Sequence, residues 1–340
     1  MSSDTPPRPA KVFFAEAISR ALSEAMTRDP RIVVLGQDVG RYGGPYREFA
    51  GLHAAFGADR VRDTPVAEAA MIGVGVGAAA AGLRPVVSIT YMDFLMLALD
   101  PLVNYGAKLR YKTGGQLRAP VVVKTTAGAK GQGVAHAQCL EAWLMGVPGL
   151  KVVAPSTPAD AYGLLKSALR EDGPVVFVDH KRLVPVAGPL PAHEHVTPFG
   201  RAQVVRDGRD VTIATHGYMT VVALDAARRL AHEGVSCEVV DLRSLAPLDV
   251  GTVAASAART GALVTLEEGQ PSCGVGAEVA FRVRDAVGTL RVARVGALPA
   301  PVSSNPVLEA ACVPDASRVV ETVRRLLDPA RRAAPPSEES

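Results

Sequence analysis

Residues 63–81 read DTPVAEAAMIGVGVGAAAA, a helix-start signal joined to an apolar helix. Thr64 is a suitable cap and Pro65 suits the first helical position, so we predict a helix over Val66–Ala81. Glu68 then lies one turn inside this helix and is followed only by small or apolar residues. An acid at a helix start often does no more than offset the helix dipole. A lone carboxylate this close to apolar surface is nevertheless a candidate for chemistry.

Outward from this stretch, short β-branched runs alternate with amphipathic segments. We predict strands at Ile32–Leu35, Pro85–Ile89, Val121–Lys124, Lys151–Ala154, Val175–Val178, Val211–Ala214, Cys237–Asp241, Leu263–Leu266 and Val292–Val295. The helices expected between them are Phe13–Met26, Phe94–Tyr111, Gln138–Met145, Pro158–Glu171, Val221–His232, Val250–Ala258, Ala277–Val287 and Ala316–Leu327. Strands that alternate with helices indicate parallel sheets, so the predicted fold is α/β with two doubly wound domains.

Length and proline content suggest where these domains meet. A chain of 340 residues is long enough for two domains, each with its own core. A stretch without periodicity contains Pro189, Pro191 and Pro198. We therefore expect a first domain over 1–185, a linker over 186–205, a second domain over 206–330 and a disordered tail over 331–340.

Composition excludes several classes of protein. The 37 basic and 34 acidic residues nearly balance, and no basic block is interleaved with aromatic residues, so nucleic acid is not an expected partner. The start of the chain has no secretory signal, and the apolar run Ala69–Ala81 is too short to span a membrane. The cysteines are scattered, which favours reduced thiols in the cytoplasm: Cys139, Cys237, Cys273 and Cys312.

Two other sequence patterns are typical of different kinds of site. Gly73, Gly75 and Ala78 match the dinucleotide fingerprint G-x-G-x-x-A, but they fall inside a predicted helix instead of between a strand and a helix. His193 and His195 have a spacing that suits a metal ion, but no third ligand lies near them. We therefore predict neither a dinucleotide site nor a metal site in this chain.

Eight short segments, in order along the chain, resemble one family: Gly36–Gly40 (GQDVG), Asp63–Glu68 (DTPVAE), Gly82–Val86 (GLRPV), Gly114–Gln116 (GGQ), His136–Gln138 (HAQ), Pro148–Val153 (PGLKVV), Asp241–Arg243 (DLR) and Gly274–Glu278 (GVGAE). The chain resembles the beta subunit of the thiamine-diphosphate-dependent, decarboxylating component of 2-oxo-acid dehydrogenase complexes. This resemblance implies a pyrimidine-binding domain followed by a transketolase-type C-terminal domain.

The resemblance also assigns site residues. The family glutamate that Glu68 matches bonds to ring nitrogen N1′ of thiamine diphosphate and promotes its imino tautomer. Phe94 stands where the family places an aromatic ring against the aminopyrimidine, although core packing would explain it equally well. His136 matches a family histidine, and an imidazole there can transfer protons as a lipoyl sulfur is reduced.

Three residues depart from the family pattern. Gln37 replaces an acid of the cofactor cavity, so proton supply at this candidate cofactor-binding residue is altered. Pro101 stands where relatives have glutamine and is expected to bend or interrupt the helix that carries Phe94. Ala137 lacks the hydroxyl of the family motif beside His136.

The sequence contains no Gly-Asp-Gly, with which the family holds the diphosphate and Mg²⁺. The resemblance therefore implies an alpha subunit that supplies the metal ligands in an α₂β₂ heterotetramer. The implied reaction is decarboxylation of a small 2-oxo acid and transfer of the acyl group to a lipoyl acyltransferase. Pyruvate, branched-chain oxo acids and acetoin all fit as substrates.

Two alternatives stay open at this stage. The chain is also compatible with half of a split transketolase-like enzyme that transfers carbon units without a lipoyl acceptor. A non-catalytic scaffold subunit is the other alternative, with Gln37, Pro101 and Ala137 as signs of drift.

Overall fold

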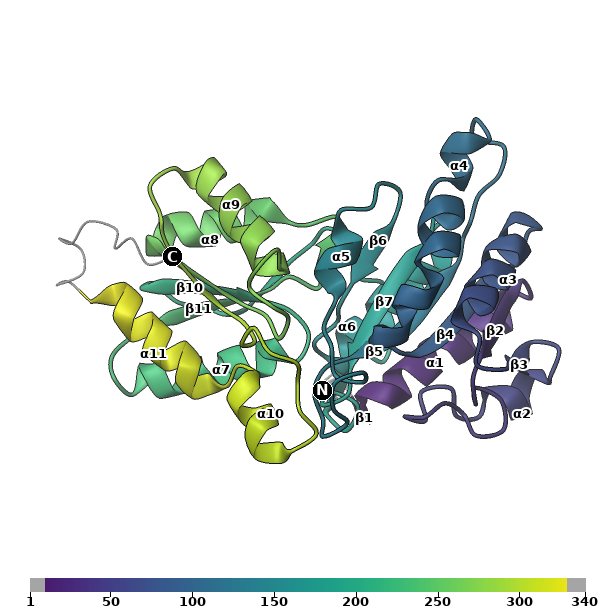
Figure 1. Cartoon of the computed structure of the whole chain (residues 1–340), viewed down its shortest axis with the longest axis horizontal. Helices are drawn as coiled ribbons and strands as arrows, with labels where there is room; N and C mark the ends of the chain where they lie inside the picture. The colour runs from purple at the N-terminus through teal and green to yellow at the C-terminus, as the bar shows by residue number, and fades with distance from the viewer. Residues whose placement is uncertain (1–9, 329–340) are drawn as a thin grey trace, which may run out of the picture. The chain divides into compact units, whose positions relative to one another are not determined.

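The computed structural model describes residues 10–328, so the predicted tail over 331–340 lies outside the described residues. These residues form two compact units (Figure 1). The first comprises residues 10–127 and 144–199, and the second comprises residues 128–143 and 200–328. The segment 128–143 therefore interrupts the first unit in sequence but belongs structurally to the second.

The first unit is built on a parallel sheet. Its strands lie in the order β6-β7-β5-β4-β2-β3, with bounds β2 (Ile32–Gly36), β3 (Val61–Asp63), β4 (Arg84–Tyr91), β5 (Val122–Ala127), β6 (Lys151–Val153) and β7 (Val175–His180). Every residue of β5 and β7 is buried, as expected for central strands covered on both faces. Two further strands, β1 (Ala10–Phe13) and β8 (Ala187–Leu190), pair antiparallel.

Helices pack on this sheet in two groups. In one group, α1 (Phe14–Arg28) packs against α6 (Pro158–Arg170). In the other, α3 (Glu68–Ala80) packs against a 3₁₀ helix, η1 (Met92–Ala98), and a π-helix, η2 (Asp100–Gly106). Shorter helices complete the set: α2 (Leu52–Phe56), α4 (Leu109–Lys112) and α5 (Glu141–Met145), which crosses the boundary between the units.

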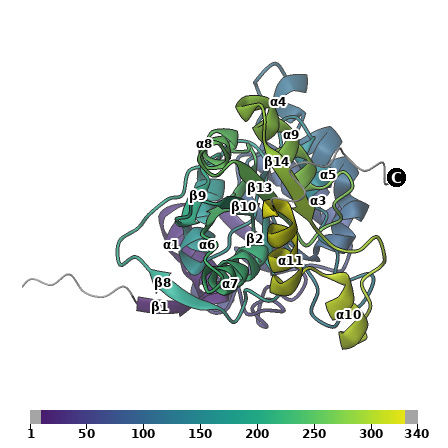
Figure 2. The same cartoon turned by 90° about the vertical axis from the view of Figure 1, so that its left-hand side faces the viewer.

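The second unit has its own sheet in the order β14-β13-β10-β11-β9. Its elements are β9 (Gln203–Arg206), β10 (Val211–Thr215), α7 (Met219–Ala231), β11 (Cys237–Asp241), β12 (Ser244–Ala246), α8 (Val250–Thr260), β13 (Ala262–Leu266), α9 (Val275–Val287), β14 (Arg291–Val295), α10 (Pro306–Cys312) and α11 (Ala316–Leu327). Helices α8 and α9 lie on one face of the sheet, and α7 and α11 lie on the other (Figures 1 and 2). The predicted α/β class is confirmed, with one addition: edge strand β9 runs antiparallel.

The helix at the opening stretch begins later than predicted. Its first residue is Glu68, not Val66, and its cap is Ala67, whose side chain makes no capping bond. Ala67 has φ −157° and ψ 74°, outside the helical region, because the chain stays extended after β3. The main-chain N–H of Thr64 donates to the carbonyl of Gly36 at 3.0 Å, so Thr64 belongs to the strand end. Glu68 is therefore the first residue of α3 instead of lying one turn inside it.

The predicted helix over Phe94–Tyr111 is broken, and the expected interruption at Pro101 is confirmed. The segment consists of η1, η2 and α4 in succession. Pro101 has no main-chain N–H, and its ring excludes the carbonyl four residues earlier. The turn widens in response, and Ala107 donates to the carbonyl of Leu102, five residues back, at 2.8 Å.

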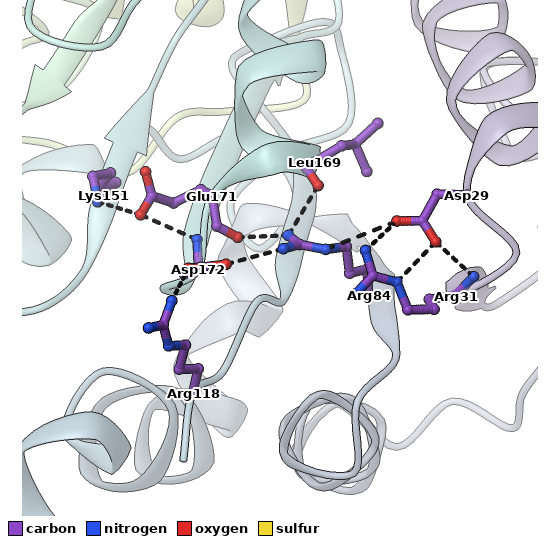
Figure 3. A network of polar contacts seen from close by, with 8 residues as sticks. All are labelled: Asp29, Arg31, Arg84, Arg118, Lys151, Leu169, Glu171 and Asp172. Atoms are coloured by element: carbon purple, nitrogen blue, oxygen red, sulfur yellow. Dashed lines mark hydrogen bonds and ion pairs between the residues drawn. The ribbon is translucent and has the colours of Figure 1, made fainter. Parts of the chain in front are cut away.

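A polar network fixes the sheet of the first unit at the amino ends of its strands (Figure 3). Arg84, the first residue of β4, donates to the carbonyls of Leu169 and Glu171 at 3.1 and 2.9 Å and to Asp172 Oδ1 at 2.9 Å. The Arg84 guanidinium also lies 4.0 Å from Asp29 Oδ2, after α1. One side chain thus ties together β4, the end of α6 and the end of α1.

Among residues 10–328, no helix has both the length and the apolar character needed to cross a membrane.

Candidate active site

Three predicted site residues follow neighbouring strands of the first sheet where those strands end. Gln37 comes directly after β2, Glu68 five residues after the end of β3, and Phe94 three residues after the end of β4. Strand β2 pairs with both β3 and β4, and Gly36 is in register with Asp63. In open α/β sheets, ligands bind outside the carboxyl ends of the strands. The structure therefore brings Gln37, Glu68 and Phe94 to the edge of the sheet where a ligand is expected.

A close contact locks the loops that carry two of these residues. The main-chain N–H of Gly40 donates to Asp63 Oδ1 at 2.7 Å, which joins the loop after β2 to the end of β3. A Cβ atom at position 40 would lie 2.4 Å from Asp63 Oδ2, so any larger residue there would displace the Asp63 side chain. The loop of Gln37 and the segment that leads to Glu68 are thereby held together.

The Glu68 carboxylate is partly exposed at the N-terminus of α3. Within the described part of the chain, it has neither a hydrogen-bond partner nor an ion-pair partner. The main-chain N–H groups of the first helical turn place positive partial charge beside it. An unpaired carboxylate at a strand end is therefore available to a ligand.

Phe94 and Gln37, unlike Glu68, each contact a side chain close by in the sequence. Phe94 is half-buried on η1, and its ring meets the Tyr91 ring edge-on, with centroids 6.4 Å apart and planes at 65°. The Lys181 ammonium lies 4.9 Å from the centroid of the same Tyr91 ring. Gln37 is half-buried, and its Nε2 donates to Asp38 Oδ2 at 3.3 Å. The Phe94 ring is thus held by Tyr91, while the Gln37 amide is engaged by its neighbour.

Behind this edge lies a buried charge cluster that sequence reasoning missed. The Lys124 ammonium on β5 lies 2.7 Å from Glu48 Oε1 and 3.0 Å from Asp179 Oδ2, and it donates to the Thr126 hydroxyl at 2.9 Å. All three charged side chains are almost fully buried. Burial raises the pKa of Asp179, and the Lys124 charge offsets part of that rise. Burial disfavours the ammonium, yet the two carboxylates hold the Lys124 pKa above its usual value. In the sequence, the one indication of this cluster is Lys124, a lysine at the end of a predicted apolar strand.

His136 belongs to the second unit and is therefore not grouped with the other three residues. It is half-buried on the loop 128–139, between exposed Ala135 and buried Ala137. A cavity of about 370 Å³ lies beside this loop within the second unit. Its walls are formed by the loop and by the ends of β13 and β14: Val134, Ala137, Gln138, Cys139, Leu140, Glu268, Gly269, Gln270, Ala297, Pro299, Ala300, Pro301 and Val302.

One of the two histidines with metal-like spacing has a structural use. His195 Nε2 contacts the carbonyl of Ala159 at 2.9 Å, and its ring stacks on Tyr162 with centroids 4.9 Å apart. These contacts tie the segment after β8 to α6.

Comparisons with known proteins also divide the chain into two domains. A family model described as the transketolase pyrimidine-binding domain matches residues 10–186, and one described as the transketolase C-terminal domain matches residues 200–319. The beta subunit of acetoin:2,6-dichlorophenolindophenol oxidoreductase from Cupriavidus necator is 40% identical over 331 residues, which cover 93% of this chain and 98% of the relative. Pyruvate dehydrogenase E1 component subunit beta-1 from Arabidopsis thaliana is 45% identical over 79% of this chain and 75% of its own length.

A solved structure shares the fold at a lower level of identity. It is described as a split gene transketolase, inactive beta4 tetramer, and superposes with a TM-score of 0.77 at 28% identity. The match covers 93% of this chain and 98% of that one. The chain therefore belongs to the transketolase-like family, among the beta subunits of thiamine-diphosphate-dependent 2-oxo-acid dehydrogenase components.

Proposed function

We propose that this chain acts with an alpha subunit to decarboxylate a small 2-oxo acid on thiamine diphosphate. The acyl group then passes to a lipoyl acyltransferase. The observation that carries the proposal is the unpaired Glu68 carboxylate at the carboxyl edge of the first sheet. The names of the relatives, which include pyruvate and acetoin enzymes, support the reaction class.

The residues at this edge fit the pyrimidine half of thiamine diphosphate. The Glu68 carboxylate would bind the aminopyrimidine and hold a proton there, and the Phe94 ring would pack against it. An offset ring contact adds about 0.5–1.5 kcal/mol beyond the burial of area. Bound thiamine diphosphate supplies the carbon nucleophile that attacks a 2-oxo carbonyl group. Gln37, which follows the neighbouring strand β2, brings a neutral amide to the same edge, and an amide does not pass protons as an acid would.

His136 serves the later half of the reaction in this proposal. Its imidazole moves a proton when the acyl group passes to a lipoyl sulfur. In this proposal the pyrimidine-binding domain spans residues 1–185 along the chain, the linker 186–205 and the C-terminal domain 206–330, and the His136 segment 128–143 packs with the second unit.

The diphosphate and Mg²⁺ are assigned to the alpha subunit, because this sequence has no Gly-Asp-Gly. Large apolar side chains on the first unit support a partner surface there. After Glu68, α3 has no charged residue, and Val74 on its outer side is 62% exposed. Leu97 and Tyr111 are 64% and 91% exposed. Exposed apolar side chains of this kind are typical of protein interfaces, which is consistent with an α₂β₂ assembly. We place this assembly in the cytoplasm because the scattered cysteines suit reduced thiols.

A second candidate function has one observation in its favour. The solved structure with a TM-score of 0.77 carries the description of a split transketolase. A split transferase would use the same Glu68 but would need no lipoyl acceptor.

The test is co-expression with an alpha-type chain that carries Gly-Asp-Gly, followed by two assays. An artificial electron acceptor reports oxidative decarboxylation of pyruvate and branched-chain oxo acids and oxidative cleavage of acetoin, and a free lipoyl domain reports acyl transfer. We expect turnover with one of these substrates and acylation of the lipoyl domain. Ketol transfer without lipoyl acylation would favour the split transferase, and inactivity in every assay would contradict both functions.

A further inference from the structure

The loop that carries His136 contains two glycines with left-handed backbone conformations. Gly131 and Gly133 both adopt left-handed backbone conformations, with φ of 75° and 81°. Glycine in such positions confers large backbone freedom on a loop. A histidine that acts at one point in space therefore needs anchors outside the loop.

Two buried acids of the second unit supply such anchors. Glu268 Oε1 accepts the main-chain N–H of Ala129 at 2.6 Å, and Glu309 Oε2 accepts that of Gly131 at 2.5 Å. The acids are only 8% and 6% exposed; the bond to Ala129 is buried and the bond to Gly131 is partly buried. The intervening Lys130 is exposed, and its main-chain N–H has no acceptor among residues 10–328.

An apolar contact fixes the other side of the histidine. Ala137, which directly follows His136, forms a small buried cluster with Ala129 and Val313, against which Val302 packs. The main-chain N–H of His136 donates to the carbonyl of Gly133 at 3.2 Å. Along the chain, His136 thus lies between anchored Gly131 and buried Ala137.

Glu309 lies in a helix, and Glu268 lies in the bend that follows β13. Strand β13 is followed by Glu267 and then by Glu268. The Glu267 carboxylate accepts the main-chain N–H groups of Val275 and Gly276 at 2.9 and 2.8 Å. Those bonds fix the turn between β13 and α9. Glu309 lies within α10, where its own N–H donates to the carbonyl of Asn305 at 2.8 Å. Hydrogen bonds thus hold the neighbour of Glu268 and the main chain of Glu309.

We propose that Glu268 and Glu309 are positioning residues for His136, which they act on through the main-chain N–H groups of its loop. This inference rests on the proposed function only for the step that it affects, the acyl transfer assigned to His136. A misplacement of about 1 Å in an active group can lower a rate by roughly 10²-fold. The second domain thereby determines where the imidazole of the transfer step lies.

Hydrogen exchange of the unmodified full chain tests the anchors without any assay of activity. With fragmentation that resolves single amides, we expect Ala129 and Gly131 to be protected and Lys130, between them, to exchange freely. Rapid exchange at both Ala129 and Gly131 would overturn the proposal, whatever reaction the protein catalyses.

Substitutions test the consequence for the reaction. Glu268→Ala and Glu309→Ala remove the acceptor, whereas Glu268→Gln and Glu309→Gln keep an oxygen in its place. In the complex with the alpha subunit, we expect the alanine variants to lose about tenfold to 100-fold in lipoyl acylation. Decarboxylation read by an artificial acceptor should stay within about threefold of the unmodified complex, and the glutamine variants should recover most of the acylation. Glu278→Ala, at an exposed carboxylate 3.9 Å from Arg282 on α9, is the matched control.

The outcomes separate this inference from the proposed function. Equal losses in the two assays, or alanine variants that acylate like Glu278→Ala, would contradict a positioning role. If the unmodified complex decarboxylates no substrate, the proposed function fails, but exchange at Ala129 and Gly131 still decides whether the anchors exist.

Discussion

At the scale of the residue, Glu68 lies where a ligand is expected and has no hydrogen-bond or ion-pair partner among residues 10–328. It is the first residue of α3, partly exposed, at the edge where the parallel strands end. The Lys124, Glu48 and Asp179 charges satisfy one another in the interior. Of these carboxylates, Glu68 is the one open to exchange a proton with a ligand.

Glu68→Gln should abolish most turnover and leave the fold intact, because the amide has nearly the same shape but cannot exchange the proton. Assistance by a general acid or base is worth about 10²- to 10⁴-fold in rate. Steady-state assays of the cofactor-saturated complex measure the effect. Glu321→Gln, at a carboxylate 67% exposed on α11, is the control. Near-normal turnover of the Glu68 variant would refute the assignment.

His136→Ala should impair lipoyl acylation more than decarboxylation, because the two assays share the early steps and differ in the sulfur chemistry. The measurement is the ratio of the two rates in one preparation. Equal losses would instead assign His136 to the shared steps.

At the scale of the element, sequence periodicity predicted the strands better than the helix starts. Strands are marked by buried β-branched runs, whereas the start of α3 depended on Ala67, whose backbone the sequence does not specify. Pro101 was informative because proline acts locally. Glu268, Glu309 and Lys124 were missed because their roles depend on partners far away in sequence, which no local pattern reveals.

The buried cluster of the first unit allows a stability prediction. Lys124→Met should leave two carboxylates buried without a counter-charge and lower the free energy of unfolding by roughly 3–5 kcal/mol. Lys151→Met is the matched control, because its ammonium pairs with Glu171 at 3.0 Å but is 32% exposed. That pair should contribute less than about 1 kcal/mol. Chemical denaturation of both variants measures the difference, and equal midpoints would show that the cluster adds no stability.

Glu141, at the start of α5, should make stability depend on pH. Burial, together with the charges of Glu267 and Glu268, raises the pKa of its carboxyl group to about 7 from an ordinary 4.5. The folded state therefore keeps a proton that the unfolded state loses, and stability falls as pH rises from about 4.5 through 7. Glu141→Gln should remove this loss and be more stable than the unmodified chain at pH 8 by roughly 1–3 kcal/mol. Thermal unfolding at several pH values tests this, and a pH-independent difference between the two proteins would contradict it.

At the scale of the whole molecule, the central claim is that this chain holds half of a cofactor site. In the proposed function, Glu68 and Phe94 bind the aminopyrimidine, but the sequence contains no Gly-Asp-Gly for the Mg²⁺-diphosphate. A ligand that binds only the assembled state also stabilises the assembly, so cofactor and partner should reinforce one another.

Calorimetric titration with thiamine diphosphate and Mg²⁺ tests this claim most directly, first with the chain alone and then with its alpha partner. We expect weak or undetectable binding to the lone chain, and stoichiometric, Mg²⁺-dependent binding once the partner is present. Tight stoichiometric binding to the lone chain would contradict the account.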